Sequence, residues 1–165
     1  MHISPDIRSL DIKKLEKILL KQNFKRYRAN QINDWLTKGG VSSFQEMKNL
    51  PKDLISFLNS RFIINNVDIK LIKKSKDGTV KFLISLFDKN IIEAVLIPTE
   101  KRITACISSQ VGCSLDCDFC ATAKIRRMRN LDFYEIFDQT MILNAESFKL
   151  FGRSISNIVF MGMGE

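Results

Sequence analysis

The stretch Gly112-Cys113-Ser114-Leu115-Asp116-Cys117-Asp118-Phe119-Cys120-Ala121 carries three cysteines at a C-x3-C-x2-C spacing. A 4Fe–4S cluster is normally held by four cysteine thiolates. A loop with only three of them leaves one iron with an open position, which a small chelating molecule can occupy. The spacing therefore predicts an iron–sulfur centre at Cys113, Cys117 and Cys120 that takes part in chemistry.

Zinc and disulfide bonds are the main alternatives for these cysteines. Zinc sites usually pair C-x2-C or C-x4-C units, and here the fourth ligand would be Cys106 or the only histidine, His2. Inert cysteines are usually scattered, whereas these three lie within eight residues. The N-terminus lacks the charged and apolar regions of a secretory signal, so we expect a reducing cytoplasm and no structural disulfide. The spacing therefore favours an iron–sulfur site.

The composition indicates a soluble, globular protein. The chain has 165 residues, of which 45% are hydrophobic, enough for one full domain or two small ones. No segment reaches the roughly 18 uninterrupted apolar residues that a membrane-spanning helix needs, so we expect no membrane partner.

Basic residues exceed acidic ones and give a formal net charge of +8. The excess is concentrated in residues 13–28 and in residues 101–130, which surround the cysteine loop. A positive surface beside a reactive centre suits a phosphate-bearing substrate, because phosphate contacts supply most of the non-specific affinity for nucleic acid. For residues 13–28, a merely solvated helix face is an equal alternative.

The first sixty residues predict a small helical domain without a catalytic constellation. Apolar residues recur at helical spacing in three segments, of which the second ends at Gly39-Gly40 and the third follows Pro51. The recurring residues are Ile12, Leu15, Ile18 and Leu19, then Ile32, Trp35 and Leu36, then Leu54, Phe57, Leu58 and Phe62. Trp35 fits a helix core better than a base-stacking surface, because its neighbours at this spacing are apolar.

After the helical segments the hydrophobic period changes to two, as strands require. Lys76-Asp77-Gly78 and Asp88-Lys89-Asn90 are turn signals, and residues 80–86 and 91–97 alternate beside them. Glu93 shares a strand face with apolar residues. Such a carboxylate is either exposed at a sheet edge or buried, and a buried one would suit a proton acceptor. The pattern leaves both possibilities open.

The remaining residues predict a βαβ unit. Strands at residues 103–108 and 158–161 flank the cysteine loop and a helix from about residue 132 to residue 148, on which Phe133, Ile136, Phe137 and Met141 are expected to face inward. Functional loops of such units lie at the C-terminal ends of the strands. We therefore expect Gly162-Met163-Gly164-Glu165 beside the cysteine loop, where glycines let backbone groups approach a ligand closely.

Six motifs follow one another along the chain. They are Gln31-Ile32-x-x-Trp35, Asp77-Gly78-Thr79-x-Lys81, Ile92-Glu93-Ala94-Val95-x-Ile97-Pro98, the run from Cys106 to Ala123, Arg129-Asn130-Leu131 and Gly162-Met163-Gly164-Glu165. Together they resemble the RlmN-type RNA (adenine-C2) methyltransferases, radical S-adenosylmethionine (SAM) enzymes that are close to the Cfr (adenine-C8) enzymes. Radical SAM proteins in general share only the cysteine loop and the glycine-rich turn.

The resemblance implies an α/β fold with three parts. These are a helical RNA-binding accessory domain at residues 1–65, a β-hairpin extension at residues 66–98, and the first part of a partial (β/α)6 barrel at residues 99–165 that carries a 4Fe–4S cluster and SAM. It implies methylation of C2 of one adenine in 23S ribosomal RNA and of an adenine beside the anticodon in certain transfer RNAs. An electron donor such as flavodoxin, a cytoplasmic location and a monomeric full-length enzyme are implied as well.

The resemblance also assigns roles to residues by position. The residues expected to bind the cofactors are Cys113, Cys117, Cys120, Phe119, Gly162, Gly164 and Glu165. Glu93 matches the proton acceptor of the family. Cys106 matches a thiol that helps to release the methylated RNA through a transient disulfide. The implied reaction uses a carrier cysteine that takes a methyl group from one SAM, while a second SAM supplies the radical.

Two features depart from the family pattern. Arg126-Arg127 stands where relatives often carry glycine and an aromatic residue. The methyl-carrying cysteine of the family lies far downstream, and all four cysteines present already have other roles. We therefore expect this sequence to be the N-terminal part of a longer enzyme and to be inactive alone. An adenine-C8 enzyme and a non-catalytic, metal-stapled RNA-binding module are the alternatives left open.

Overall fold

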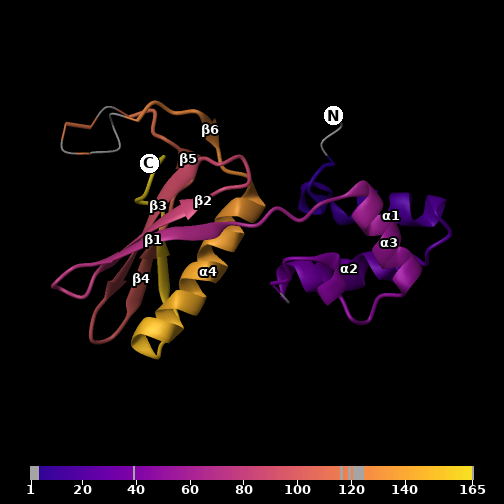
Figure 1. The fold of residues 1–165 in the computed structure, drawn as a ribbon, viewed down its shortest axis with the longest axis horizontal. Helices are drawn as coiled ribbons and strands as arrows, with labels where there is room; N and C mark the ends of the chain where they lie inside the picture. The colour runs from indigo at the N-terminus through magenta and orange to yellow at the C-terminus, as the bar shows by residue number, and fades with distance from the viewer. Residues whose placement is uncertain (1–3, 39, 116, 119, 121–124, 165) are drawn as a thin grey trace. The chain divides into compact units, whose positions relative to one another are not determined.

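The computed structural model describes residues 4–38, 40–115, 117, 118, 120 and 125–164. The chain divides into two compact units, residues 1–65 and residues 66–165, each with its own hydrophobic core. Figure 1 shows helices in the first unit and a sheet with one long helix in the second. The predicted α/β fold with a helical N-terminal part is confirmed. A barrel is not seen among the described residues and stays a prediction.

The described residues of the first unit form a small helical bundle. Its elements are η1 (Ile7–Ser9), α1 (Ile12–Lys21), α2 (Tyr27–Thr37), η2 (Phe44–Glu46) and α3 (Lys52–Arg61). The apolar stripes predicted from the sequence form the core, in which Leu19, Ile32 and Leu54 are fully buried. Trp35 packs partly buried against this core, and its indole N–H donates to the Asn49 side chain at 2.6 Å. These contacts favour the core role of Trp35.

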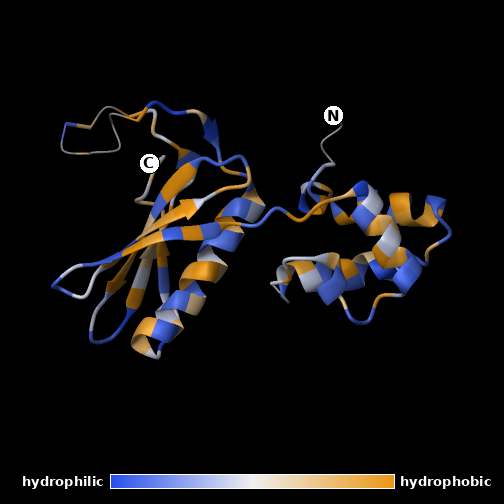
Figure 2. Ribbon diagram, viewed as in Figure 1, coloured by the Kyte–Doolittle hydropathy of each residue, from blue (hydrophilic) through white to orange (hydrophobic). Residues whose placement is uncertain are grey.

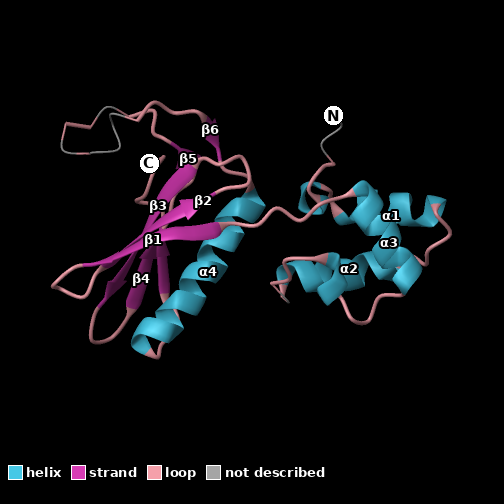
Figure 3. Ribbon diagram, in the orientation of Figure 1, coloured by secondary structure: helices cyan, strands magenta, loops and turns pink. Residues whose placement is uncertain are grey.

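The second unit contains, in its described residues, a five-stranded sheet in the order β1-β2-β3-β4-β7 (Figure 3). The strands are β1 (Asp68–Lys74), β2 (Val80–Ser85), β3 (Ile91–Pro98), β4 (Ile103–Cys106) and β7 (Asn157–Val159). Strands β1 to β4 are antiparallel, and β7 pairs with β4 in parallel after the cysteine loop and α4 (Phe133–Phe151). The βαβ unit is therefore confirmed. The expected domain boundary after residue 98 falls between two paired strands and stays a prediction.

Side chains alternate along the strands and give the sheet two different faces. One face is buried in the core with Leu143 of α4 and carries Val80, Phe82, Ile84, Ile92, Ala94, Leu96, Ile103 and Ala105. The opposite face, called the open face below, carries Leu71, Lys73, Lys81, Leu83, Glu93, Val95 and Cys106. Figure 2 shows hydrophobic residues in the middle of the strands and hydrophilic ones at the hairpin turns.

Both predicted hairpin turns are present. Gly78 has a φ of +87° and Lys89 a φ of +69°, the left-handed backbone that tight turns require. The carboxylate of Asp77 accepts from the Thr79 N–H at 3.0 Å, and that of Asp88 accepts from the Asn90 N–H at 3.1 Å. Short polar side chains therefore set the two turns locally, as the sequence predicts.

The rotation of α4 differs from the prediction. Its buried residues include Glu135, Gln139, Leu143 and Ser147, spaced four apart, whereas Phe133 is 66% exposed and Met141 is 40% exposed. The expectation that Phe133 and Met141 face inward is wrong. The inward positions include Glu135 and Gln139, whose side chains make hydrogen bonds to Arg129 and Ser108 in other segments. None of the described helices combines the length and the apolar character needed to cross a bilayer.

Candidate functional site

The glycine-rich turn after β7 lies against the residues that follow β4. The Met163 carbonyl accepts from the N–H groups of Ser109 at 2.9 Å and Gln110 at 3.1 Å. The Gly162 N–H donates to the Ile107 carbonyl at 3.0 Å. Because Gln110 leads directly into the cysteine loop, the two motifs meet at the C-terminal ends of two neighbouring parallel strands, as predicted.

Two glycines of this turn have no room for a side chain. A Cβ on Gly162 would lie 2.6 Å from the Ser108 Oγ and 2.7 Å from the Ile107 carbonyl oxygen. Gly164 has a φ of +100°, and a Cβ there would collide with the Gln110 side chain. Glycine is therefore needed at both positions for the strand ends to approach one another.

Ser108 is fully buried and joins three elements at this place. Its hydroxyl donates to the Glu93 carbonyl at 2.6 Å and accepts from the Met163 N–H at 2.9 Å. Its own N–H donates to the Gln139 side-chain oxygen at 2.8 Å, and the Gln139 side-chain nitrogen donates to the Ser108 carbonyl at 3.0 Å. Ser108 thus connects three parts of the domain by hydrogen bonds: strand β3, helix α4 and the glycine-rich turn.

Gln110 carries an unsatisfied acceptor beside the turn. Its Oε1 is the only buried side-chain polar atom without a hydrogen-bond partner in the described part of the chain, while its side-chain nitrogen donates to Asn130 at 3.1 Å. A buried acceptor without a donor costs about 1–3 kcal/mol, so a ligand with an N–H or ammonium group would satisfy it. The amino group of SAM is such a donor. This oxygen therefore fits the cofactor that the sequence implies.

The cysteine loop is closed at its base by a short ladder. Strand β5 (Gln110–Val111) pairs with β6 (Arg129–Asn130), and the Cys113 N–H donates to the Ile125 carbonyl at 3.1 Å. Gly112 has a φ of +73°, and a Cβ there would collide with the Arg126 backbone. The loop therefore leaves and re-enters the domain at one narrow place next to the glycine-rich turn.

The cysteines have the donor chemistry that a cluster requires. None of the four cysteines, all within the described residues, forms a disulfide. The Cys120 N–H donates to the Cys117 carbonyl at 3.0 Å, so these two residues share one tight turn. In the part of the chain that the structure describes, no three Cys, His, Asp or Glu side chains are gathered as a metal site. Phe119 and Glu165 lie outside the described residues.

Arg129 ties the base of the cysteine loop to two other elements. Its guanidinium donates to the Glu135 carboxylate at 2.7 and 2.8 Å and to the Asp88 carboxylate at 2.8 Å. Glu135 is 2% exposed, and the hydrogen bonds to it raise the pKa of the Arg129 guanidinium above its usual range. Removing one partner of a buried ion pair costs about 3–5 kcal/mol. Arg129 therefore holds the loop base to the β2–β3 turn and to the start of α4.

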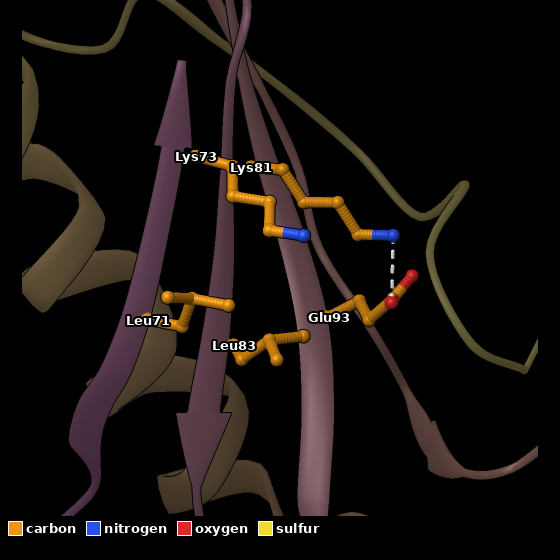
Figure 4. Close-up of a pocket in the computed structure, with 5 residues that line it drawn as sticks. All are labelled: Leu71, Lys73, Lys81, Leu83 and Glu93. Carbon is orange, nitrogen blue, oxygen red and sulfur yellow. Dashed lines mark ion pairs between the residues drawn. The ribbon is translucent and has the colours of Figure 1, made fainter.

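Glu93 lies on β3, inside the sheet between β2 and β4. The edge position considered above is therefore wrong. The Glu93 side chain is half-buried, and its Oε1 lies 2.6 Å from the Lys81 Nζ. A cavity of about 110 Å³ beside this pair is lined by Leu71, Lys73, Lys81, Leu83 and Glu93 (Figure 4). The carboxylate thus faces a small cavity on the open face.

Cys106 lies on the same face as Glu93. It pairs with Val95 in the β3–β4 ladder, and cross-strand partners project their side chains to one side of a sheet. Glu93 is two residues from Val95 and therefore shares that side. Cys106 is 9% exposed. The structure brings together the two residues for which the family resemblance implies a role in the reaction.

Sequence reasoning did not single out Lys81, Ser108, Gln110 or Gln139 as parts of this site. Gln139 could have been found from the sequence, because it is a polar residue at a core position of a predicted helix and a buried amide needs hydrogen-bond partners. No spacing rule identifies Ser108, since its partners lie 15, 31 and 55 residues away in the chain.

Known proteins are similar to this chain along nearly its whole length. Residues 6–64 match the family model of the ribosomal RNA large subunit methyltransferase N-terminal domain. Over 160 residues the chain is 49% identical to a protein of Flavobacterium johnsoniae named as a probable dual-specificity RNA methyltransferase RlmN, with 97% of this chain and 46% of that protein covered. The chain therefore resembles the N-terminal part of RlmN proteins along nearly its whole length.

Other relatives show the same similarity. An RlmN relative from Chlorobaculum tepidum is 44% identical, covering 97% of this chain and 45% of its own length. The crystal structure of a radical SAM methyltransferase from Sphaerobacter thermophilus matches with a TM-score of 0.79 at 34% identity, covering 98% of this chain and 47% of that one. The chain thus spans about half the length of the RlmN relatives that it matches.

Proposed function

We propose that this chain acts in a radical SAM RNA methyltransferase. The products are C2-methylated adenines in 23S ribosomal RNA and beside the anticodon of transfer RNAs. The observation that carries the proposal is the packing of the glycine-rich turn against the residues that lead into the cysteine loop, since it supports one site for two cofactors. The kinship with RlmN proteins supports RNA as the substrate class.

The chain would hold both cofactors at the ends of β4 and β7. The cofactor-binding residues are Cys113, Cys117, Cys120 and Phe119 in the cluster loop, and Gly162, Gly164 and Glu165 for SAM. The Gln110 Oε1 would help to hold SAM by accepting a hydrogen bond from its amino group. When bound, the 4Fe–4S cluster and SAM supply the radical chemistry that adenine C2 requires, because this aromatic carbon is not a nucleophile.

The open face would present the residues that act on the substrate. Glu93 accepts a proton from the adenine, and Cys106 helps to release the methylated RNA through a transient disulfide. Both side chains project from the same face of the sheet, which supports roles on one substrate. The base has to leave its stack, at a cost of about a few kcal/mol that basic contacts to the RNA offset.

The basic segment of the first unit supports an RNA partner. Its exposed cationic residues are Lys13, Lys14, Lys17, Lys21, Lys25 and Arg26. Arg26 pairs with Glu16 at 2.8 Å and Lys14 with Asp11 at 3.4 Å. The other four lysines have no ion pair within the described residues, so they remain available for phosphates. An electron donor such as flavodoxin is the further protein partner that the proposal includes.

The test is a chimera in which residues 1–165 replace the matching span of the Flavobacterium johnsoniae relative. The chimera is expressed in bacteria without their own RlmN, and methylated adenosines from ribosomal and transfer RNA are measured by mass spectrometry. We expect 2-methyladenosine in both RNAs and its loss with Cys117→Ala. Formation of 8-methyladenosine instead would assign an adenine-C8 activity. No methylation, together with one zinc per chain, would support the RNA-binding module.

A further inference from the structure

The Glu93 carboxylate depends on one neighbour for its orientation. Among the described residues, the Lys81 Nζ is the only hydrogen-bond donor or cation in contact with this carboxylate, at 2.6 Å. The residue directly opposite Glu93 on β2 is Leu83, whose side chain has no polar group. The Ser108 hydroxyl donates a hydrogen bond to the backbone carbonyl of Glu93 and not to its side chain.

The register of the sheet places Lys81 for this contact. Lys81 pairs with Val95 and Leu83 with Glu93, so Lys81 and Glu93 are diagonal neighbours on one face. A long side chain spans this diagonal. Figure 4 shows Lys81 and Glu93 reaching toward each other across the cavity wall, with Leu71 and Leu83 beside them.

Stability does not explain the pair well. The Lys81 side chain is 46% exposed and the Glu93 side chain 32%, and exposed pairs of this kind add little to the free energy of folding. The pair does fix where the two carboxylate oxygens lie.

We propose that Lys81 is a positioning residue for Glu93, holding the carboxylate on the open face where the adenine arrives. This inference rests on the proposed function, in which Glu93 accepts a proton. Lys73, the cross-strand partner of Lys81 on β1, lines the same cavity but has no ion pair within the described residues. Lys73 is therefore the control residue: it places a cation beside the same cavity but forms no ion pair with Glu93.

The contact itself is tested on the 165-residue chain with a water-soluble carbodiimide. The reagent activates a carboxylate, a neighbouring amine attacks it, and an amide forms while the reagent leaves as a urea. We expect a Lys81–Glu93 cross-link in peptide mass spectra, its loss in Lys81→Met, and its retention in Lys73→Met. The Lys149–Glu146 pair, also 2.6 Å apart, is the internal control in every sample. A cross-link of Glu93 to Lys73 instead would overturn the assignment.

The role is tested in the methylating chimera with Lys81→Met, Lys81→Arg and the distant control Lys149→Met. Misplacing a reacting group lowers rates on the order of ten- to a hundredfold, so Lys81→Met should lower kcat by this factor with an unchanged KM for RNA. Lys81→Arg should restore most of kcat, and Lys149→Met should change neither constant. A raised KM with unchanged kcat would show an RNA contact and overturn the proposal. An inactive parent chimera would refute the proposed function, while the cross-link still decides the contact.

Discussion

The buried hydroxyl of Ser108 accepts a hydrogen bond from the Met163 backbone N–H at 2.9 Å. These residues stand 55 positions apart in the chain, and the contact fastens the glycine-rich turn to the segment between β4 and the cysteine loop. The same hydroxyl donates to the Glu93 carbonyl at 2.6 Å. The turn and the strand that carries Glu93 are therefore coupled through a single side chain.

Ser108→Ala should loosen the glycine-rich turn. The substitution removes the partner of the Met163 N–H and of the Glu93 carbonyl, at a cost of about 1–3 kcal/mol. The matched control is Ser147→Ala, which also removes a fully buried hydroxyl, one that donates to the Arg153 carbonyl at 2.7 Å. Both variants should lower Tm, but only Ser108→Ala should speed amide hydrogen exchange at Met163. The same exchange rate at Met163 in both variants would contradict the coupling.

Gly164→Ala should cost far more stability than Gly152→Ala. Both glycines have positive φ, but a Cβ on Gly152 would meet nothing within 4 Å, whereas one on Gly164 would collide with the Gln110 side chain. Gly152→Ala should therefore cost only the backbone strain, about 1 kcal/mol. Denaturant unfolding measures both values. Similar losses in the two variants would mean that Gln110 moves aside easily and that the close approach is not needed.

Asp88 should make the free energy of unfolding depend on pH in the acidic range. Burial acts to raise the pKa of Asp88, but hydrogen bonds from Arg129 and Asn90 lower it below its ordinary value of 3.8. A carboxylate whose pKa is lower in the folded state than in the unfolded state stabilises the protein at pH values above its unfolded-state pKa. This stabilisation is lost as the pH falls through the folded-state pKa. The wild type should exceed Asp88→Asn in free energy of unfolding at neutral pH, and this difference should shrink as the pH falls below 3.8. A difference that stays constant as the pH falls further would argue against the carboxylate.

Iron content should distinguish the three cysteines that bind the cluster from Cys106, which does not. After anaerobic reconstitution with iron and sulfide, the chain should bind about four irons and four sulfides, as a 4Fe–4S cluster requires. Cys106→Ala should keep this content because Cys106 lies on β4, outside the cysteine loop. Cys117→Ala should lose most of it. Equal loss of iron in both variants would make Cys106 a ligand and leave no open coordination position.

Glu93→Gln should abolish methylation without unfolding the chain. The carboxamide keeps the shape and can still accept a hydrogen bond from Lys81, but it cannot take a proton. General-base catalysis contributes roughly a hundred- to ten-thousandfold, so the yield of 2-methyladenosine in the chimera should fall by this order. Unchanged Tm and RNA affinity are the controls. Wild-type turnover would return Glu93 to a purely structural role.

Much of the fold was predictable because its signals are local. Asp77-Gly78 and Asp88 set turns within a few residues, and alternation in β2 identified the buried face of the sheet. The rotation of α4 was not predictable in this way. Hydrophobic spacing pointed to Phe133 and Met141, yet the helix buries Gln139, whose partner Ser108 lies on another element. Buried hydrogen bonds between distant segments outweigh the apolar pattern there, and a pattern within one helix carries no information about them.

The sequence by itself determined the C-x3-C-x2-C spacing of the thiols in the cysteine loop, because this spacing involves neighbouring residues only, and it predicts an iron–sulfur cluster there. It also determined that Gly162 and Gly164 stand in a turn. Only the tertiary structure decided that this turn packs against Gln110, and that Lys81 reaches Glu93. The physical reason is that both contacts depend on the register between separate strands, which is set by the packing of the whole sheet against α4 and not by any short stretch of the chain.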